Sequence, residues 1–341
     1  MSKGIFFIST SDANYTVDLL KKLLDNTKKA GFSGFCYHFT NGGTIQLALH
    51  DPVLKTEFGE YDLTPAYTRT KESGDKITAI SEEEIIEVMD YAKELDLEFI
   101  PSLDVPGHMA YILKQFPQFA LEGSADSIDI KNPEAVAFAL AFVEKYAEFF
   151  SKFDCELFGI GADEFAQGLN NEMGFETIYE NGDMKYFVEF INKVVDCVCA
   201  KGFDPIGWND GIYYNEDAEK YGKFDNRLIV LYWSPGWGRR FASPAFIEAQ
   251  GHRMINCYHT LYVPFHTEHD SFEGKLDLLR NHKPDVIVDR DGIIHENFKL
   301  KNSLGTFMCN WGPVEGDPEK MPEAMWPYME AFGEGYKGYN K

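Results

Sequence analysis

Eight short apolar segments recur along the chain, separated by longer amphipathic ones. We predict strands at residues 4–9, 34–39, 98–103, 156–161, 205–209, 228–233, 253–258 and 304–310. These segments are too apolar for strands with one face in water, so helices are expected to cover both faces. Eight buried strands alternating with helices predict an α/β fold, in which a parallel sheet closes into a single (β/α)8 TIM barrel.

The segments between the strands predict about eight helices. The clearest are expected near residues 14–30, from 81 onward, 132–152, 184–201, 243–250, 271–281 and 319–333. Ser81 is followed three residues later by Glu84, a capping-box pattern, and Asn132-Pro133-Glu134 supplies a cap, a first-turn proline and a first-turn acid. An open doubly wound sheet is the alternative architecture, but no glycine-rich phosphate fingerprint follows any strand.

Length and composition show no break that would divide the chain. The 341 residues fit one barrel of roughly 250 residues with insertions. Hydrophobic residues make up 44% of the chain, which is enough for a large core. We therefore expect one barrel domain over residues 1–341.

The charge and the cysteines limit the partners and the compartment. A net charge of −23 argues against nucleic acid or an anionic membrane, because phosphates would be repelled. No apolar run approaches the roughly 18 residues of a membrane span, and the N-terminal apolar stretch is too short for a secretory signal. The six cysteines form no CxxC pair and are typical of reduced core thiols. These features predict a cytoplasmic protein.

Polar and aromatic residues gather at the predicted carboxyl ends of the strands, where barrel enzymes place their chemistry. In strand order they are His38; Asp104 and His108; Asp163 and Glu164; Trp208, Asn209 and Asp210; Trp233; Tyr258 and Tyr262; and Trp311. Each has an ordinary explanation alone, such as packing for a tryptophan or helix capping for an Asp-Glu pair. Their coincidence on one rim predicts a sugar site, because aromatic rings pack on sugar C–H faces while carboxylates accept from hydroxyls.

The stretch FGIGADEF, residues 158–165, ends in two adjacent acids. On an extended strand Asp163 and Glu164 would point to opposite sides, so they would not face each other as nucleophile and acid. Ordinary retaining glycosidases instead place two carboxyls about 5 Å apart across the scissile bond. The doublet favours substrate-assisted catalysis. One acid orients a 2-acetamido group that attacks the anomeric carbon, and the other protonates the leaving oxygen and then deprotonates water.

The ordered motifs resemble those of glycoside hydrolase family 20, the β-N-acetylhexosaminidases, and most of all its dispersin-like single-barrel members. The motifs are HFT (38–40), DVPGHM (104–109), GIGADEF (159–165), GWNDG (207–211), YWS (232–234), INCYHTLYVP (255–264) and NWG (310–312). The resemblance covers residue 4 to about 335. It implies a single catalytic domain without cofactor or metal, acting on an oligosaccharide or glycoconjugate with a β-linked N-acetylhexosamine.

The resemblance also implies roles for individual residues. Asp163 would polarise the acetamido nitrogen and Glu164 would be the general acid and base, with His108 and Asp104 acting on Glu164 from behind. The substrate-binding residues would be Trp208, Trp233 and Trp311 around the N-acetyl group and ring, Tyr262 on the acetamido oxygen with Tyr258 as the alternative, and Asp210 and Arg239.

Three positions depart from the family pattern, and all concern the outer hydroxyls of the terminal sugar. Ser11 stands about where the family carries an arginine in the first strand. Pro313 stands where an acid usually follows the last tryptophan, with Glu315 two residues further on. The stretch YWSPGWGRRF offers Arg239 and Arg240 where some relatives carry acids.

These departures leave three explanations open for that subsite. The first is a substituted sugar, with release of a disaccharide as in lacto-N-biosidases. The second is a sulfated or phosphorylated amino sugar held by Arg239 or Arg240. In the third the arginines are a solvated surface pair, and Gln46 or Asn41 serves the hydroxyls.

Two other classes of protein are also open from the sequence. One is a carbohydrate-binding barrel that has lost catalysis. The other is a metal hydrolase, for which His38, Asp104 and His108 come nearest to a set of ligands. The number of subunits is left open.

Overall fold

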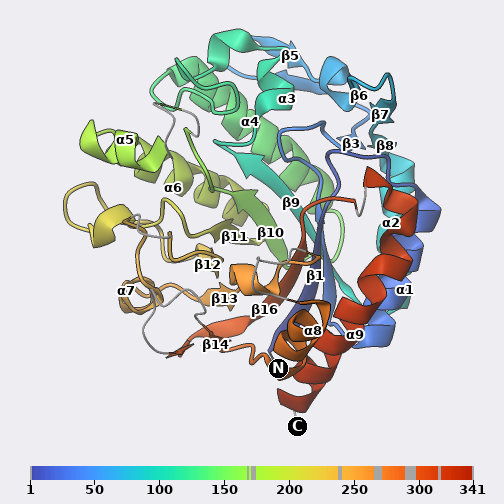
Figure 1. Ribbon diagram of the computed structural model, residues 1–341. Helices are drawn as coiled ribbons and strands as arrows, with labels where there is room; N and C mark the ends of the chain where they lie inside the picture. Colours follow the sequence, from blue (N-terminus) through green and yellow to red (C-terminus); the bar gives the residue numbers. More distant parts are fainter. Residues whose placement is uncertain are drawn as a thin grey trace.

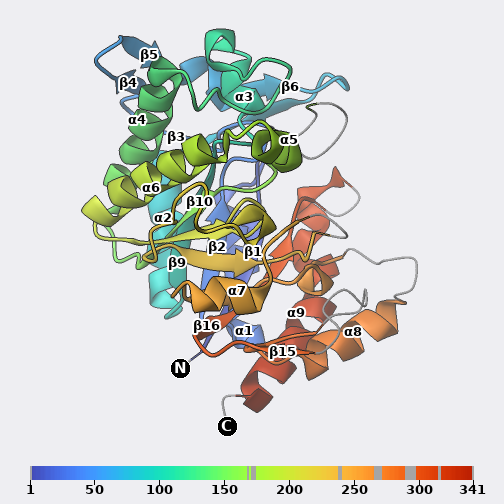
Figure 2. The same ribbon diagram turned by 90° about the vertical axis from the view of Figure 1, so that its left-hand side faces the viewer.

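The computed structural model describes residues 2–339 apart from 167–168, 170–173, 237–239, 265–270, 289–296 and 314–315. Eight parallel strands close into a barrel, and helices form a ring around it (Figures 1 and 2). In barrel order the strands are β1 (Lys3–Ser9), β16 (Ser303–Asn310), β13 (Met254–Asn256), β12 (Ile229–Tyr232), β11 (Asp204–Trp208), β10 (Leu157–Gly161), β9 (Glu98–Val105) and β2 (Gly34–His38). The predicted (β/α)8 barrel is confirmed.

The seven helices predicted by position are also present. They are α1 (Val17–Ala30), α2 (Glu82–Glu94), α4 (Pro133–Phe150), α6 (Met184–Ala200), α7 (Pro244–Ala249), α8 (Phe272–Asn281) and α9 (Met321–Tyr339), with the shorter α3 (Ala110–Leu113) and α5 (Gly174–Glu180) between them. Ser81 and Glu84 form the predicted capping box, and the Asn132 side chain accepts from the Glu134 N–H. Within the described residues, no helix is both long and apolar enough to cross a lipid bilayer.

The fifth unit of the barrel, for which the sequence placed no helix, has no α-helix between its strand and the next one. Residues 209–228 are all described, and their helical structure is limited to the 3-10 turn η4 (Tyr214–Glu216). Tyr213, Asn215 and Glu216 have φ angles of 56°, 63° and 54°, in the left-handed region that L side chains rarely adopt. The link between β11 and β12 is therefore an irregular loop on the rim.

Small two-stranded sheets were not predicted, because strands of two or three residues are too short to show an alternating pattern. Three of them lie between β2 and α2. They pair β3 (Leu47–Ala48) with β8 (Ile80–Ser81), β4 (Val53–Lys55) with β5 (Glu60–Asp62), and β6 (Thr68–Thr70) with β7 (Lys76–Thr78). A fourth joins β14 (Val286–Ile287) to β15 (Phe298–Lys299). The remaining 3-10 turns are η1 (Thr64–Tyr67), η2 (Pro117–Phe119), η5 (His259–Leu261) and η7 (Pro318–Lys320).

The barrel strands are buried on both faces, as their composition predicted. In β1, Phe6 and Ile8 pack against the outer helices, whereas Ile5 and Phe7 belong to a second apolar cluster inside the barrel. The inner cluster also holds Cys36, Cys257 and Cys309, and all six cysteines of the chain are free. Aromatic rings close this inner core at the carboxyl ends of the strands, directly under the predicted site.

Close packing of α9 against α1 gives a test of the fold. A Cβ added at Gly333 would lie 1.9 Å from the backbone oxygen of Ala30, so Gly333→Ala would force the two helices apart. We expect a loss of about 3 kcal/mol in the free energy of unfolding, measured by urea denaturation. Gly274→Ala in α8 is the control, because its Cβ would meet only the Ser271 hydroxyl, at 3.2 Å. Equal stability of the two variants would contradict the packing described.

Candidate active site

A cavity of about 340 Å³ opens at the carboxyl ends of the barrel strands. Its lining consists of Asn41, His108, Asp163, Glu164, Trp233, Tyr262 and Trp311. These residues follow six different strands: β2, β9, β10, β12, β13 and β16. The barrel topology thus brings together residues up to 270 positions apart in the sequence, from Asn41 to Trp311. Six of the seven are residues predicted for the catalytic or substrate-binding set, and Asn41 was an alternative for the sugar hydroxyls.

The backbone turns sharply at the acid doublet, so the premise of an extended strand there is wrong. Strand β10 ends at Gly161, and the φ angles of Gly161, Ala162, Glu164 and Ala166 are 70°, 75°, 44° and 59°. Left-handed backbone at the three non-glycine residues costs about 1 kcal/mol each. The result is that both carboxylates reach the same neighbour instead of pointing to opposite sides.

Two glycines allow the loops after β9 and β10 to pack backbone against backbone. A Cβ at Gly161, where φ is already positive, would lie 2.5 Å from Asp104 Oδ1. A Cβ at Gly107 would lie 2.8 Å from the backbone oxygen of Asp163. Glycine at these positions lets the PGH turn approach the doublet closely enough for His108 to contact it.

His108 is the neighbour that both acids share. Its Nε2 lies 3.4 Å from Asp163 Oδ2 and 3.4 Å from Glu164 Oε2. Burial of the imidazole disfavours its charged form, but the negative charges of Asp163, Glu164 and Asp104 outweigh burial and raise the pKa of His108 well above its usual value. His108 was predicted to act on Glu164 from behind; in the structure it contacts both acids and itself lines the cavity.

Asp163 is only 8% exposed, and within the described residues one of its oxygens has no hydrogen-bond partner. Burial raises the pKa of Asp163 above its ordinary value, while the contact with His108 through Oδ2 works in the opposite direction. Its Oδ1 accepts no hydrogen bond from any described residue, although it is shielded from solvent. Because this oxygen has almost no surface open to the cavity, its missing partner is a cost to the fold and not by itself a contact offered to a ligand.

Asp210 was predicted to bind substrate, but it is fully buried and does not line the cavity. Its Oδ2 accepts from the Glu164 backbone N–H at 3.2 Å, and its Oδ1 accepts from the indole N–H of Trp233. Burial, followed by the charges of Asp163 and Glu164, raises the pKa of Asp210 well above its ordinary value. Asp210 therefore holds two cavity residues in place from beneath.

Asn209 makes a second connection between these loops that the sequence did not predict. Its Oδ1 accepts from the backbone N–H groups of Trp233 at 2.8 Å and Ser234 at 3.3 Å, and its Nδ2 donates to the Ser234 oxygen at 2.8 Å. Adjacent Asn209 and Asp210 thus fix the backbone and the ring of Trp233 separately. Their position directly after an apolar strand was the only signal available in the sequence.

Three aromatic rings form the apolar part of the cavity. Trp233 stacks on Tyr262 with ring centroids 6.1 Å apart and planes at 10°, and Trp311 packs edge-on against Tyr262 at 5.6 Å. The indole N–H of Trp311 has no acceptor among the described residues. Trp208 is 2% exposed and lies against Trp311 at 5.4 Å, outside the lining of the cavity. Trp208 thus supports the wall from the barrel core.

Of the two tyrosines left open by the sequence, Tyr262 reaches the cavity. Tyr258 is buried beside Tyr232, with centroids 6.5 Å apart, and against His259 at 4.5 Å. The turn η5 lies between the two tyrosines and carries the chain from β13 to the cavity wall. Burial raises the pKa of Tyr262 well above its ordinary value, so the phenol keeps its proton as a donor.

The three candidate metal ligands do not converge on one point. His38 Nε2 lies 2.9 Å from Asp104 Oδ2 and its Nδ1 lies 2.9 Å from Ser102 Oγ, all of them buried, whereas His108 contacts Asp163 and Glu164 instead. In the part of the chain that the structure describes, no group of three or more His, Cys, Asp or Glu side chains is arranged to hold a metal ion. His38 and Asp104 form a buried pair behind the site.

The residues considered for the outer hydroxyls differ in whether they line the cavity. Asn41 lines the cavity, and its backbone oxygen accepts from the hydroxyl of buried Ser11 at 3.2 Å. Gln46 is fully buried and donates to Thr44, so it is not available to a ligand. Of the three residues, only Asn41 presents a side chain to the cavity.

Arg240, which follows β12, forms its ion pairs away from the cavity. Arg240 pairs with Glu176 at 2.5 Å and with Glu180 at 3.1 Å, both on α5, and it lies over the ring of Tyr179. Its guanidinium therefore belongs to a surface cluster, as in the third explanation for the subsite. Arg239, a predicted substrate-binding residue, lies outside the described residues, as does Glu315.

The environment of Asp210 predicts a pH-dependent stability. Because the folded-state pKa of Asp210 lies above its ordinary value of 3.8, the folded chain keeps a proton that the unfolded chain releases. Stability contributed by this group therefore falls as the pH rises from about 4 through the raised pKa. We expect the free energy of unfolding of Asp210→Asn to fall less steeply with pH than that of the wild type.

The slope between pH 4 and 8, measured by urea denaturation, is the readout, since loss of one hydrogen bond also lowers the absolute stability of the variant. Asp90→Asn, at an exposed position of α2, is the matched control and should keep the wild-type slope. Identical slopes for all three proteins would mean that Asp210 is ionised in the fold as it is in the unfolded chain.

The sequence of this chain is similar to those of known proteins. The model of a family described as glycosyl hydrolase family 20, catalytic domain, matches residues 10–336. A lacto-N-biosidase of Bifidobacterium bifidum is 26% identical over 185 residues, which are 50% of this chain and 16% of that protein. A β-hexosaminidase of Vibrio furnissii is 25% identical over 170 residues, 46% of this chain and 27% of that protein. The chain thus spans less than a third of the length of these two curated relatives.

Among solved structures, a catalytic module of the pneumococcal exo-β-D-N-acetylglucosaminidase StrH superposes with a TM-score of 0.84. The superposition covers 99% of this chain and 84% of that one, at 22% sequence identity. At this identity the likeness concerns the fold.

Proposed function

Because this chain belongs to glycosyl hydrolase family 20, we propose that it is a retaining β-N-acetylhexosaminidase. Its substrates would be oligosaccharides or glycoconjugates that end in β-linked N-acetylglucosamine or N-acetylgalactosamine. The observation that carries the proposal is the placement of Asp163 and Glu164 together in the wall of one aromatic cavity. The names of the two relatives, a β-hexosaminidase and a lacto-N-biosidase, support the same substrate class.

We assign Asp163 to the substrate's own amide. The N–H of the 2-acetamido group would donate to one oxygen of this carboxylate, which would then stabilise the positive charge that the amide gains as its oxygen attacks the anomeric carbon. His108 holds Oδ2 and fixes the direction of the carboxylate. The product of this step is a cyclic oxazolinium bound in the pocket, formed without a covalent bond to the protein.

Glu164 is the proposed general acid and base. Its side chain lines the cavity and is 23% exposed, so it can reach both a leaving oxygen and an incoming water. In the first step it would give its proton to the leaving oxygen, and in the second it would take a proton from water. Asp210 and His108 hold its backbone and its carboxylate, which limits its motion between the two steps.

The rings would select the sugar. Trp233 and Trp311 offer apolar faces to the pyranose ring and the acetamido methyl group, and the Tyr262 hydroxyl would donate to the acetamido oxygen. A cavity of about 340 Å³ lies at the lower end of the range for small-molecule sites, which fits one sugar ring better than two. We therefore favour release of a single terminal sugar, with Asn41 on its hydroxyls.

Two further features of this chain are proposals of the same kind. We propose that residues 1–341 act as one catalytic domain that needs no cofactor. We also propose a cytoplasmic location, on the sequence argument that six unpaired cysteines are typical of a reducing compartment.

Loss of the proton donor should stop turnover but not binding. For Glu164→Gln we expect the kcat on an N-acetyl-β-glucosaminide with a poor leaving group to fall by roughly 10³-fold or more, with little change in KM. Glu180→Gln, which neutralises a surface carboxylate on α5, is the control and should keep wild-type kinetics. A Glu164→Gln enzyme with near-normal kcat would remove Glu164 from the mechanism.

Participation of the substrate's amide can be tested separately. A thiazoline that mimics the cyclised intermediate should bind the wild type at least roughly 10²-fold more tightly than the free product sugar. Asp163→Asn should lose most of this advantage, and its kcat should fall by several orders of magnitude. A β-glucoside with a 2-hydroxyl in place of the amide should not be cleaved. Cleavage of that glucoside at a comparable rate would rule out neighbouring-group catalysis.

A further inference from the structure

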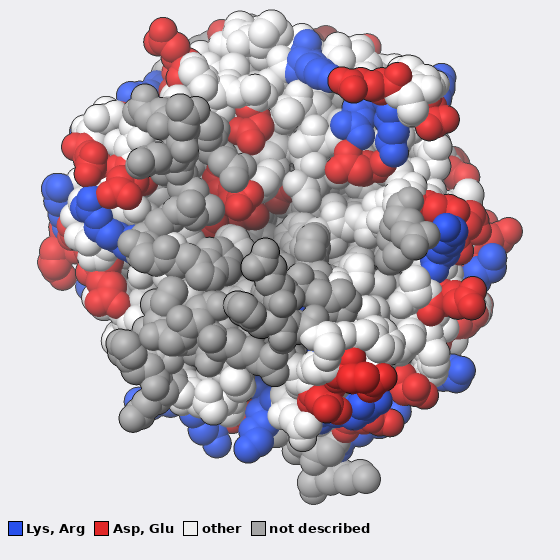
Figure 3. All heavy atoms as spheres, viewed as in Figure 1, with Lys and Arg blue, Asp and Glu red and all other residues white. Residues whose placement is uncertain are grey.

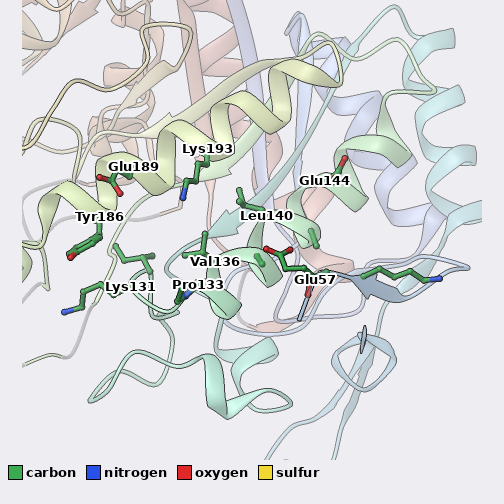
Figure 4. Close-up of a pocket in the computed structure, with 14 residues that line it drawn as sticks. Glu57, Lys131, Pro133, Val136, Leu140, Glu144, Tyr186, Glu189 and Lys193 are labelled. Carbon is green, nitrogen blue, oxygen red and sulfur yellow. The ribbon is translucent and has the colours of Figure 1, made fainter. Parts of the chain in front are cut away.

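A second hollow lies on the outside of the barrel, away from the proposed active site. It is a groove of about 550 Å³ between the β4–β5 hairpin, α4 and α6 (Figure 4). The floor is a row of partly exposed apolar side chains on α4: Val136, Ala137, Leu140 and Ala141. Tyr186 of α6 lies on one side of the row and Glu57 of the hairpin on the other.

The N-terminal half of helix α4 is apolar on both of its sides, whereas Glu144, Lys145 and Glu148 make the outer side of its C-terminal half polar. Its inner side is buried in the core through Phe138, Phe142 and Tyr146, as in any barrel helix. Its outer side should be polar, as on α2, where exposed positions such as Glu83 and Glu87 are charged. An apolar stretch on the outer side of a helix is normally covered by another element or partner. The apolar part of the outer face of α4 therefore has the composition of an interface.

An exposed aromatic residue accompanies the groove. Phe58 stands at the tip of the β4–β5 hairpin, next to Glu57 in the groove wall, and is 49% exposed. Within the described residues it is the most exposed of the large hydrophobic side chains. A protruding ring and an apolar hollow therefore lie side by side on one face. This is what a two-fold contact requires, because each copy offers the feature that the other receives.

The charges around the groove also favour a second copy of the chain. Its lining contains three lysines, at 55, 131 and 193, and three glutamates, at 57, 144 and 189. Glu57, Glu189 and Lys193 form no ion pair with any described residue. The net charge of the chain is −23, and Figure 3 shows acidic and basic side chains interspersed over another face. A balanced rim lets two strongly acidic copies approach without local repulsion, and it pairs poorly with a partner of one charge sign.

We propose that this groove is an interface between two copies of the chain, in which Phe58 of each copy packs on the α4 floor of the other. The interface does not depend on the proposed activity, since none of its residues lines the cavity of the proposed active site.

Analytical ultracentrifugation over about 1–100 µM protein tests the proposal, a range that covers moderate association constants. The wild type should sediment with twice the mass of one chain at the upper end. Phe58→Asp and Leu140→Lys should each raise the dissociation constant at least about tenfold, because they bury a charge in an apolar contact. Lys193→Glu should also weaken association by leaving acids to face each other.

Phe272→Asp is the matched control, because Phe272 is 44% exposed on α8, away from the groove, and its replacement should leave the dimer intact. The variants should keep the wild-type circular dichroism spectrum, and Phe58, being at an exposed hairpin tip, can be replaced without loss of core packing. A wild type that stays monomeric at the highest concentration overturns the proposal. So does a dimer that Phe272→Asp weakens as much as Phe58→Asp does.

Discussion

The rest of the site depends on how the rim accommodates four carboxylates in a space largely closed to water. Buried acids that are close together repel each other and lose hydration, so each needs a cation or a donor. His108 contacts both Asp163 and Glu164, and His38 contacts Asp104. Two N–H groups donate to Asp210. Within the described residues, Asp163 Oδ1 has no donor. If the proposed function holds, the N–H of the sugar's amide would add one more donor to this group of acids.

The barrel was predictable because its strands and helices have clear local sequence patterns. Residues such as Ile5 to Ile8 are apolar on both faces, which only a covered strand explains, and Ser81 with Glu84 marks a helix start unambiguously. The irregular parts have no such signal. The link between β11 and β12 has left-handed backbone at Tyr213, Asn215 and Glu216, and nothing in those residue types demands it. Such conformations are imposed by tertiary contacts and become visible only in three dimensions.

The site was predictable in its members more than in its arrangement. Strand ends meet on one rim of any parallel barrel, so Asp163, Trp233 and Trp311 could be grouped before their positions were known. Whether a residue faces the cavity or supports one that does depends on backbone turns, such as the left-handed ones at Ala162 and Glu164. Trp208 and Asp210 were therefore assigned to the ligand although they lie beneath it. The pairing of Arg240 with Glu176, 64 residues away, likewise has no local trace in the sequence.

The aromatic wall has a spectroscopic consequence. The chain contains five tryptophans, and three of them, Trp208, Trp233 and Trp311, belong to the wall or to its immediate support. Their near-ultraviolet emission originates at the cavity, where a bound sugar would displace solvent from two indoles at once. The protein therefore carries its own fluorophores at the place of interest, and occupancy of the cavity can be followed in the unlabelled, unmodified chain.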